Sequence, residues 1–416
     1  MCYMRQFPLP LPHDDHDHPA GVVPVARILW HSNGPTITGY GQQTQVWIPR
    51  LQALGHEMIV SAYYGIQGMS IDWGGVPVLP GAVDPYGNDI LREHALRTNA
   101  DFVITLMDQW VLDPGQLQGL KVANWMPVDC QPMGIMDRQA LQRSGAVPIA
   151  MSRYGEQELR KAGFSPLYVP HGIETQKVYR PLADPAQNRR ELGLPEDAFL
   201  IGINGANKDT IRKSYPAQLR AFAEFRKRHD DALLLIHALP RSPGALDLQA
   251  IVSALDLDQH VRFSDWYTYV TGAIKPVNLA AWYGVLDLLS NASHGEGFGL
   301  PIVEAAAGGT PAVVTDHSAM TELCGAGWLV DGEPYWNGQL GHITGLQEQR
   351  QRAADHRGLH VVAGAHRSTS RAPSRRRSSR RSTSRTYSLT VRSSARAASY
   401  SRVARRALSR RARRAV

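Results

Sequence analysis

Short apolar runs alternate with amphipathic segments along most of this chain, and this alternation constrains its fold more than any other feature. In the first half we predict buried strands at 26–31, 57–64, 101–107, 121–128, 147–152 and 165–170. In the second half the matching runs are 198–205, 232–239, 260–265, 285–293 and 310–316. Continuous apolar strands separated by helices are typical of parallel sheets covered on both faces. The pattern therefore predicts an α/β fold with doubly wound sheets.

A proline-containing segment near 171–185 separates the two sets of strands. We predict an N-terminal Rossmann-like domain over 25–175 and a second one over 176–336, with a ligand cleft between them. Residues 1–24 are rich in Pro, His and Asp and show no period, so we predict a disordered arm. The His and Asp cluster at 13–18 is interpreted as solvated charge instead of a metal site, because metal sites need rigid geometry.

The charge of the chain is divided unevenly. The net charge is +8, yet every Asp and Glu lies at or before Asp355, and 18 of the 45 basic residues follow it, all as Arg. The part through Asp355 therefore holds 27 basic against 37 acidic residues. We expect 337–416 to be a disordered basic tail, since Arg, Ser and Ala cannot bury a core. Such a tail can bind nucleic acid through its charge. We favour translation in a shifted frame of a GC-rich gene, because the second domain stops before its expected end.

Other features point to a soluble protein. No apolar run approaches the ~18 residues of a membrane span, and the N-terminus lacks the basic start and apolar core of a signal peptide. The three cysteines, Cys2, Cys130 and Cys324, are odd in number and widely spaced. We expect a reduced, cytoplasmic protein without an integral membrane segment.

The segment that follows the run 285–293 carries the clearest chemistry. Its turn, His294 to Gly299, holds three glycines that let the backbone approach a ligand closely. Pro301 suits the start of a helix, whose free N–H groups and positive dipole end favour an anion. Glu296 lies in the turn, and Glu304 lies near the helix start, where an acid can accept hydrogen bonds from two ribose hydroxyls. We predict a site for a phosphate, a sugar and a ribose; solvated helix-start charges are the alternative.

Basic residues gather after the run 198–205. Lys208, Arg212 and Lys213 precede an amphipathic segment at 215–229. Cations are unfavourable at the start of a helix because that end of the dipole is positive. Their position therefore indicates a bound anion.

The sequence EGFGLPIVEAAAGGTPAVVT resembles the signature of the family 4, or group 1, retaining glycosyltransferases of the GT-B fold, with its two glutamates separated by seven residues. The resemblance implies two Rossmann-like domains that face a central cleft. It also implies that Glu296 contacts the donor sugar and is catalytic, and that Glu304 binds the nucleotide ribose. The backbone of four further residues would approach the sugar and the diphosphate: Gly297, Phe298, Gly299 and Leu300.

Two more segments match this family. Its members bind the diphosphate with an Arg and with a Lys five residues later; Lys208 and Lys213 keep this spacing, with Lys in place of Arg, and Arg212 adds a cation. The loop at 32–41 resembles the family's N-terminal glycine loop, in which Gly39 and Gly41 would face the donor. The resemblance covers about residues 25–335, without the family's last helices.

Acceptor and metal residues are less defined. Asp129, at a strand end, is a candidate base for the acceptor, and Asp108 and Trp110 are candidates for the acceptor pocket. Asp256 and Asp258 lie between a helix and a strand, and we predict a turn there instead of a metal site. We therefore predict no metal or other cofactor: Lys, Arg and the helix dipole would neutralise the diphosphate.

The resemblance implies a retaining, hexosyltransferase-type glycosyltransferase that moves a sugar from a nucleotide-diphosphate sugar to an unknown acceptor, which is a saccharide, lipid, protein or small molecule. Three alternatives stay open. These are a phosphorylase or epimerase of the same fold, a nucleic-acid-binding protein that acts through the Arg/Ser tail, and an inactive truncated product.

Overall fold

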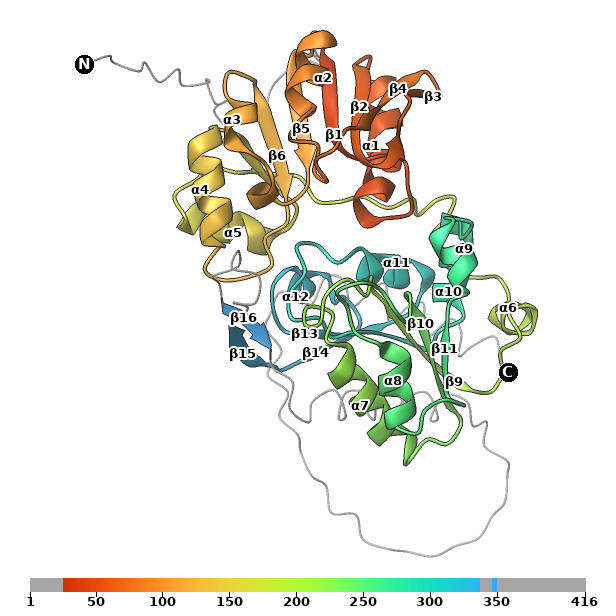
Figure 1. Cartoon of the computed structure of the whole chain (residues 1–416). Coiled ribbons are helices and arrows are strands. Elements are labelled where there is room, and N and C mark those ends of the chain that lie inside the picture. The colour runs from red at the N-terminus through yellow and green to blue at the C-terminus, as the bar shows by residue number, and fades with distance from the viewer. Residues whose placement is uncertain (1–24, 337–345, 350–416) are drawn as a thin grey trace, which may run out of the picture.

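The computed structural model describes residues 25–336 and 346–349 and contains two α/β units, one above the other (Figure 1). The N-terminal unit has an eight-stranded sheet of order β3-β4-β2-β1-β5-β6-β7-β8. The C-terminal unit has a six-stranded sheet of order β11-β10-β9-β12-β13-β14. The prediction of an α/β fold with two Rossmann-like sheets is confirmed.

The N-terminal unit alternates strands and helices as the apolar runs predict. Its elements are β1 (Arg27–Asn33), α1 (Gly39–Ala53), β2 (Glu57–Gln67), β3 (Ile71–Trp73), β4 (Val76–Gly81), α2 (Leu91–Arg97), β5 (Phe102–Leu106), η1 (Gln109–Val111), α3 (Pro114–Leu117), β6 (Val122–Met126), α4 (Ile135–Ser144), β7 (Val147–Ala150), α5 (Arg153–Lys161) and β8 (Leu167–Tyr168).

The C-terminal unit follows the same alternation. Its elements are α6 (Pro185–Glu191), β9 (Phe199–Asn204), α7 (Tyr215–Arg226), β10 (Ala232–His237), α8 (Leu248–Ala254), β11 (Val261–Phe263), α9 (Trp266–Val270), α10 (Pro276–Gly284), β12 (Leu288–Asn291), α11 (Leu300–Gly308), β13 (Ala312–Thr315), α12 (Ala319–Leu323) and β14 (Trp328–Val330). The predicted domain boundary at 175/176 falls between β8 and α6.

Neighbouring strands of both sheets run parallel, except at one edge. Strand β3 pairs antiparallel with β4, a pair that the apolar runs did not predict. Gly74 and Gly75 form the turn between them with φ of 60° and 83°, a left-handed conformation that favours glycine. In the rest of each sheet the parallel strands bring their carboxyl ends to one edge, where α/β ligand sites lie.

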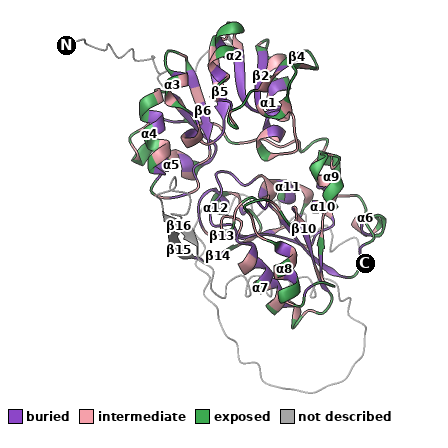
Figure 2. Cartoon of the chain, in the orientation of Figure 1, coloured by how far each residue is buried: buried purple, intermediate pink, exposed green. Residues whose placement is uncertain are grey.

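The sheets are buried and the outer faces of the helices are exposed (Figure 2). Each sheet is covered by apolar side chains on two faces, so each unit has two core clusters. One cluster of the N-terminal unit also includes Phe298 of the C-terminal unit, which joins the two units by apolar packing.

Several predictions concern residues outside the described structure. The arm at 1–24, the frameshift and most of the tail at 337–416 lie there and stay predictions. Strand β15 (Glu333–Trp336) pairs antiparallel with β16 (Leu346–Gln349), and β16 falls within the predicted tail. Within the described part of the chain, no helix is long and apolar enough to span a membrane.

Candidate active site

The glycine turn connects β12 to α11 at the carboxyl edge of the C-terminal sheet. Gly299 is the N-cap of α11 and has φ of 107°, which favours glycine because it has no side chain. Pro301 lies in the first turn of the helix, where its missing N–H costs no hydrogen bond. Glu296 sits in this turn and is only 7% exposed.

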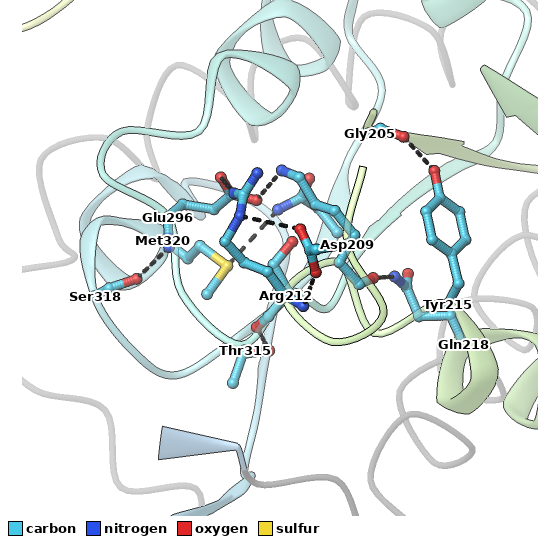
Figure 3. Close-up of polar contacts among 12 residues, drawn as sticks. Gly205, Asp209, Arg212, Tyr215, Gln218, Glu296, Thr315, Ser318 and Met320 are labelled. Carbon is cyan, nitrogen blue, oxygen red and sulfur yellow. Dashed lines mark hydrogen bonds and ion pairs between the residues drawn. The ribbon is translucent and has the colours of Figure 1, made fainter. Parts of the chain in front are cut away.

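Two cations neutralise the buried Glu296 carboxylate, and one of them, Arg212, is seen beside it in Figure 3. Lys213 Nζ lies 2.5 Å from Glu296 Oε1, and Arg212 Nη1 lies 3.4 Å from Oε2. Burial raises the pKa of Glu296, but Lys213 and Arg212 outweigh burial and hold that pKa below its usual value. Burial lowers the pKa of the Lys213 ammonium against the attraction of Glu296. The sequence-predicted cations at 212 and 213 and the predicted catalytic acid therefore form one ion cluster.

Hydrogen bonds to the backbone hold this cluster in place. Gln218 of α7 donates to the Lys213 carbonyl at 2.8 Å and accepts from Ser290 Oγ at 2.6 Å. On the other side, the Glu296 N–H donates to Ser318 Oγ at 2.9 Å (Figure 3). Ser214 and Ser318 have φ of 53° and 54°, so two left-handed serines adjoin the cluster. Such strained backbone persists where the surrounding contacts hold it, often at functional sites.

The N-terminal unit presents acids to the same cations. Burial and the neighbouring Asp129 raise the pKa of Asp108 to about 6, while Arg212 acts in the opposite direction. The Tyr40 hydroxyl donates to Asp108 Oδ2 at 3.4 Å. The negative charge of Asp129 also stabilises the charged form of Arg212. The structure therefore brings Asp108 and Asp129, from segments after two different strands, toward the cation of the other unit.

Sequence reasoning missed one member of this acidic group, Asp137. Burial and the nearby Asp108 raise the pKa of Asp137 to about 8. Its Oδ1 accepts the Trp110 N–H at 3.0 Å, so it positions the segment that holds the predicted acceptor residues. An acid in the first turn of a helix is common, and no local signal distinguished this one.

Glu304 occupies a separate hydrogen-bond group. It is 1% exposed, and its Oε2 accepts from the Tyr283 hydroxyl at 2.8 Å. Asn204 in turn donates to the Tyr283 oxygen at 2.6 Å. Burial raises the pKa of Glu304 to about 7 despite the hydrogen bond from Tyr283. The Tyr179 hydroxyl also acts on the Glu304 carboxylate and, like that of Tyr283, counteracts the effect of burial on its pKa.

Lys208 and the Phe298 ring, at two predicted donor positions, lie outside the ion cluster. Lys208 is exposed, and its Nζ lies 6.0 Å from the centre of the Tyr64 ring, so it is not part of the ion cluster. The Phe298 side chain is 8% exposed and packs against His171, with ring centres 5.2 Å apart. The Phe298 ring is packed against the N-terminal unit, so only the backbone of Phe298 could contact a donor.

The predicted glycine loop is shorter than expected. Helix α1 already begins at Gly39, because Thr38 caps it by accepting the Gly41 N–H at 3.1 Å. A side chain at Gly41 would overlap Thr36, whereas a Cβ at Gly39 would only reach contact distance of Leu300, 3.6 Å away. Gly39 thus faces the start of α11 in the other unit, and Gly41 is required by packing within its own unit.

Comparisons with known proteins show what the second unit is similar to. Residues 201–335 match the family described as glycosyl transferases group 1. The chain is a homologue of the group 1 glycosyltransferases. It is 32% identical to the D-inositol 3-phosphate glycosyltransferase of Corynebacterium jeikeium over 42% of each chain. The chain spans about half the length, or less, of this and similar curated relatives from Nocardia farcinica and Arthrobacter.

Solved structures share the fold of this glycosyltransferase homologue. Sucrose-phosphate synthase from Thermosynechococcus elongatus has a TM-score of 0.59 at 17% identity, over 73% of this chain and 86% of that one. Anabaena Alr3699/HepE in complex with UDP and glucose has a TM-score of 0.58 at 15% identity, over 83% and 90%. These likenesses establish the GT-B architecture.

The family match covers one side of the site. Arg212, Lys213, Glu296 and Glu304 fall inside 201–335, whereas Asp108 and Asp129 lie in the other unit. Across the described residues, no group of three or more His, Cys, Asp or Glu side chains is placed to hold a metal ion. Asp256, with φ of 54°, lies in the α8–β11 turn, and Asp258 accepts from Ser253 Oγ at 2.7 Å.

Proposed function

We propose that this chain is a retaining glycosyltransferase that moves a hexose from a nucleotide-diphosphate sugar to a hydroxyl group of an acceptor. One observation carries the proposal: a buried glutamate in a glycine turn, directly before a helix N-terminus, is paired with Lys213 and Arg212. Cations and a helix N-terminus are the groups that stabilise a departing diphosphate.

The cations have two functions in this proposal. Without a donor, Lys213 and Arg212 neutralise Glu296, which is buried and would otherwise be an unpaired charge. A diphosphate carries more negative charge than one carboxylate and competes for the same cations. Once they turn to the phosphates, Glu296 is free to accept hydrogen bonds from the sugar hydroxyls. Negative charge that builds up on the diphosphate as the glycosidic bond breaks is then stabilised by Lys213, Arg212 and the start of α11.

The acceptor side belongs to the N-terminal unit in this proposal. Asp108 and Asp129 act on Arg212 electrostatically, so they lie close to the proposed diphosphate site. Asp129 is our candidate for the group that positions the acceptor hydroxyl and accepts its proton. The raised pKa of Asp108, about 6, lets it hold a proton below neutral pH and donate a hydrogen bond instead.

Release of nucleoside diphosphate tests the proposal without knowledge of the acceptor. The full chain is incubated with UDP-glucose, GDP-mannose or ADP-glucose, and we expect one of them to be hydrolysed slowly, with a first product of unchanged anomeric configuration by NMR. Glu296→Ala should abolish this release, whereas the exposed Glu191→Ala should not. A requirement for inorganic phosphate would favour a phosphorylase, and a changed sugar without acceptor an epimerase. If no nucleotide sugar is turned over or raises the unfolding temperature, the proposal is wrong.

A further inference from the structure

The two units are in contact at the glycine turn of the proposed donor site. Phe298 packs in an apolar cluster of the N-terminal unit, and a Cβ at Gly295 would overlap the Asp129 carbonyl oxygen. At a site between two units, separation of the units admits the substrate and closure excludes water. The contacts between the units determine how readily this happens.

One carboxylate of the C-terminal unit accepts hydrogen bonds from the start of a helix in the N-terminal unit. Glu322 of α12 accepts the Arg153 N–H through Oε1 at 2.9 Å and through Oε2 at 3.1 Å, and the Tyr154 N–H through Oε1 at 3.3 Å. These are the first two N–H groups of α5, which have no partner within the helix. In Figure 1, α5 and α12 lie at the facing edges of the two units.

Helix α5 already has a cap of its own, which makes the contribution of Glu322 separable. Ser152 Oγ accepts the Gly155 N–H at 3.0 Å, as an N-cap side chain does. Glu322 takes the two remaining donors at the very start of the helix, and its negative charge also complements the positive end of the helix dipole. One helix terminus thus has one cap from its own unit and one from the other.

The glycine turn is in contact across the same boundary. A Cβ at Gly295 would overlap the Asp129 carbonyl oxygen, and one at Gly297 would overlap Pro127. His317, which precedes α12, lies with Nε2 3.3 Å from the same Asp129 oxygen. The turn that holds Glu296 and the helix that holds Glu322 therefore meet the N-terminal unit together, when the units are closed.

We propose that Glu322 is an interdomain latch: it caps α5 only when the units are closed and so holds the Glu296 turn against the segment 127–129. Glu322 is a positioning residue and touches neither donor nor acceptor. The latch itself does not depend on the reaction, whereas its effect on turnover rests on the proposed function.

The latch is tested on the full chain by hydrogen exchange and by a distance between the units. Spin labels on the exposed positions Gln139→Cys and Arg228→Cys, with Cys2→Ser, report the separation. In Glu322→Ala we expect about five-fold faster exchange of the Arg153 and Tyr154 amides, the effect of losing one helix cap. We also expect a larger population at long distance. Glu322→Gln keeps an acceptor oxygen, so its amide exchange and its distance between the units should change less than those of Glu322→Ala.

Two further variants test whether Glu322 holds the units together or only caps α5. Ser152→Ala removes the other cap of α5, so it should speed exchange of the Gly155 amide and leave the distance between the units unchanged. Gly295→Ala keeps Glu322 but adds a methyl group between the turn and Asp129, so it should lengthen the distance and also speed exchange at Arg153 and Tyr154. A lengthened distance in Ser152→Ala, or an unchanged one in Glu322→Ala, would overturn the latch, and Gly295→Ala shows that the labels report separation of the units.

Activity adds a readout that a purely structural role would not change. If a donor is turned over, Glu322→Ala should lower kcat more than it raises KM, because the closed complex is less populated. The hydrolysed share of the donor should rise because water is excluded less well. A chain without any donor turnover would refute the proposed function, while the distance and exchange results would still decide the latch.

Discussion

The Lys213 ammonium and the Glu296 carboxylate, 83 residues apart in the chain, lie 2.5 Å from each other beneath the surface of the C-terminal unit. Each is costly to bury alone, and each is also a group that the proposed reaction needs. This pairing stabilises the empty site and at the same time places a cation and an acid at the helix terminus that would bind the diphosphate.

Replacing Glu296 by Ala should lower turnover by at least about a hundred-fold and change nucleoside diphosphate affinity by less than about three-fold, since Glu296 is proposed to contact the sugar, which a nucleoside diphosphate lacks. Single-turnover kinetics and calorimetric titration with the nucleoside diphosphate measure the two quantities. Equal losses in turnover and affinity would contradict the role assigned to Glu296. Glu191→Ala, an exposed acid on α6, is the control.

Lys213→Met and Lys208→Met form a matched pair that tests which lysine binds the diphosphate. Lys213 is in the ion cluster, whereas Lys208 is exposed near Tyr64. We expect Lys213→Met to weaken nucleoside diphosphate binding about ten-fold or more, and Lys208→Met by about two-fold, as is typical of an exposed charge. Binding of the unphosphorylated nucleoside should change in neither. A larger effect of Lys208→Met would instead support a role for Lys208 in binding the diphosphate, as the family resemblance implies.

Glu304 should make the protein less stable as the pH rises from about 4.5 to about 7. Its folded-state pKa is raised to about 7 from 4.5, so over this window the unfolded chain loses its proton first and the folded state binds more protons. The loss approaches ~3 kcal/mol at higher pH by the linkage relation. Urea unfolding at pH 5 and pH 8 should show a smaller pH dependence in Glu304→Gln. An unchanged dependence would show that Glu304 is not buried with a raised pKa.

Gly41→Ala should lower the free energy of unfolding and Gly39→Ala should raise it, although the glycines are two residues apart. The new methyl group at position 41 overlaps Thr36, and overpacking of this kind costs ~1–3 kcal/mol. At position 39 the methyl group meets only Leu300 at 3.6 Å, and Ala stabilises such a position by ~0.4–1 kcal/mol because it lowers the entropy of the unfolded chain. Chemical unfolding measures both. Equal destabilisation by the two variants would mean that the helix start is packed differently.

The proposed reaction site could be predicted in part because its signals are local. Glycines in a turn, a proline at a helix start and an acid between them are properties of a few consecutive residues, and the structure keeps Glu296 and the start of α11 where these predict. The choice among Lys208, Arg212 and Lys213 could not be read from spacing, because it depends on how the segment before α7 folds back toward β12. The antiparallel β3–β4 pair was missed for a similar reason, since three residues are too few for a periodic signal.

The sequence by itself determined the alternation of strands and helices, the division into two α/β units and the glycine turn before a helix start, since hydrophobic period and backbone preference act over short stretches of chain. Only the tertiary structure decided which side chains pair. It buried Glu304 beneath Tyr283, placed Asp137 near Asp108, and carried Glu322 to the start of α5, 168 and 169 residues away in sequence. Such contacts arise when whole elements pack, and no local pattern encodes which distant partner a charged side chain meets.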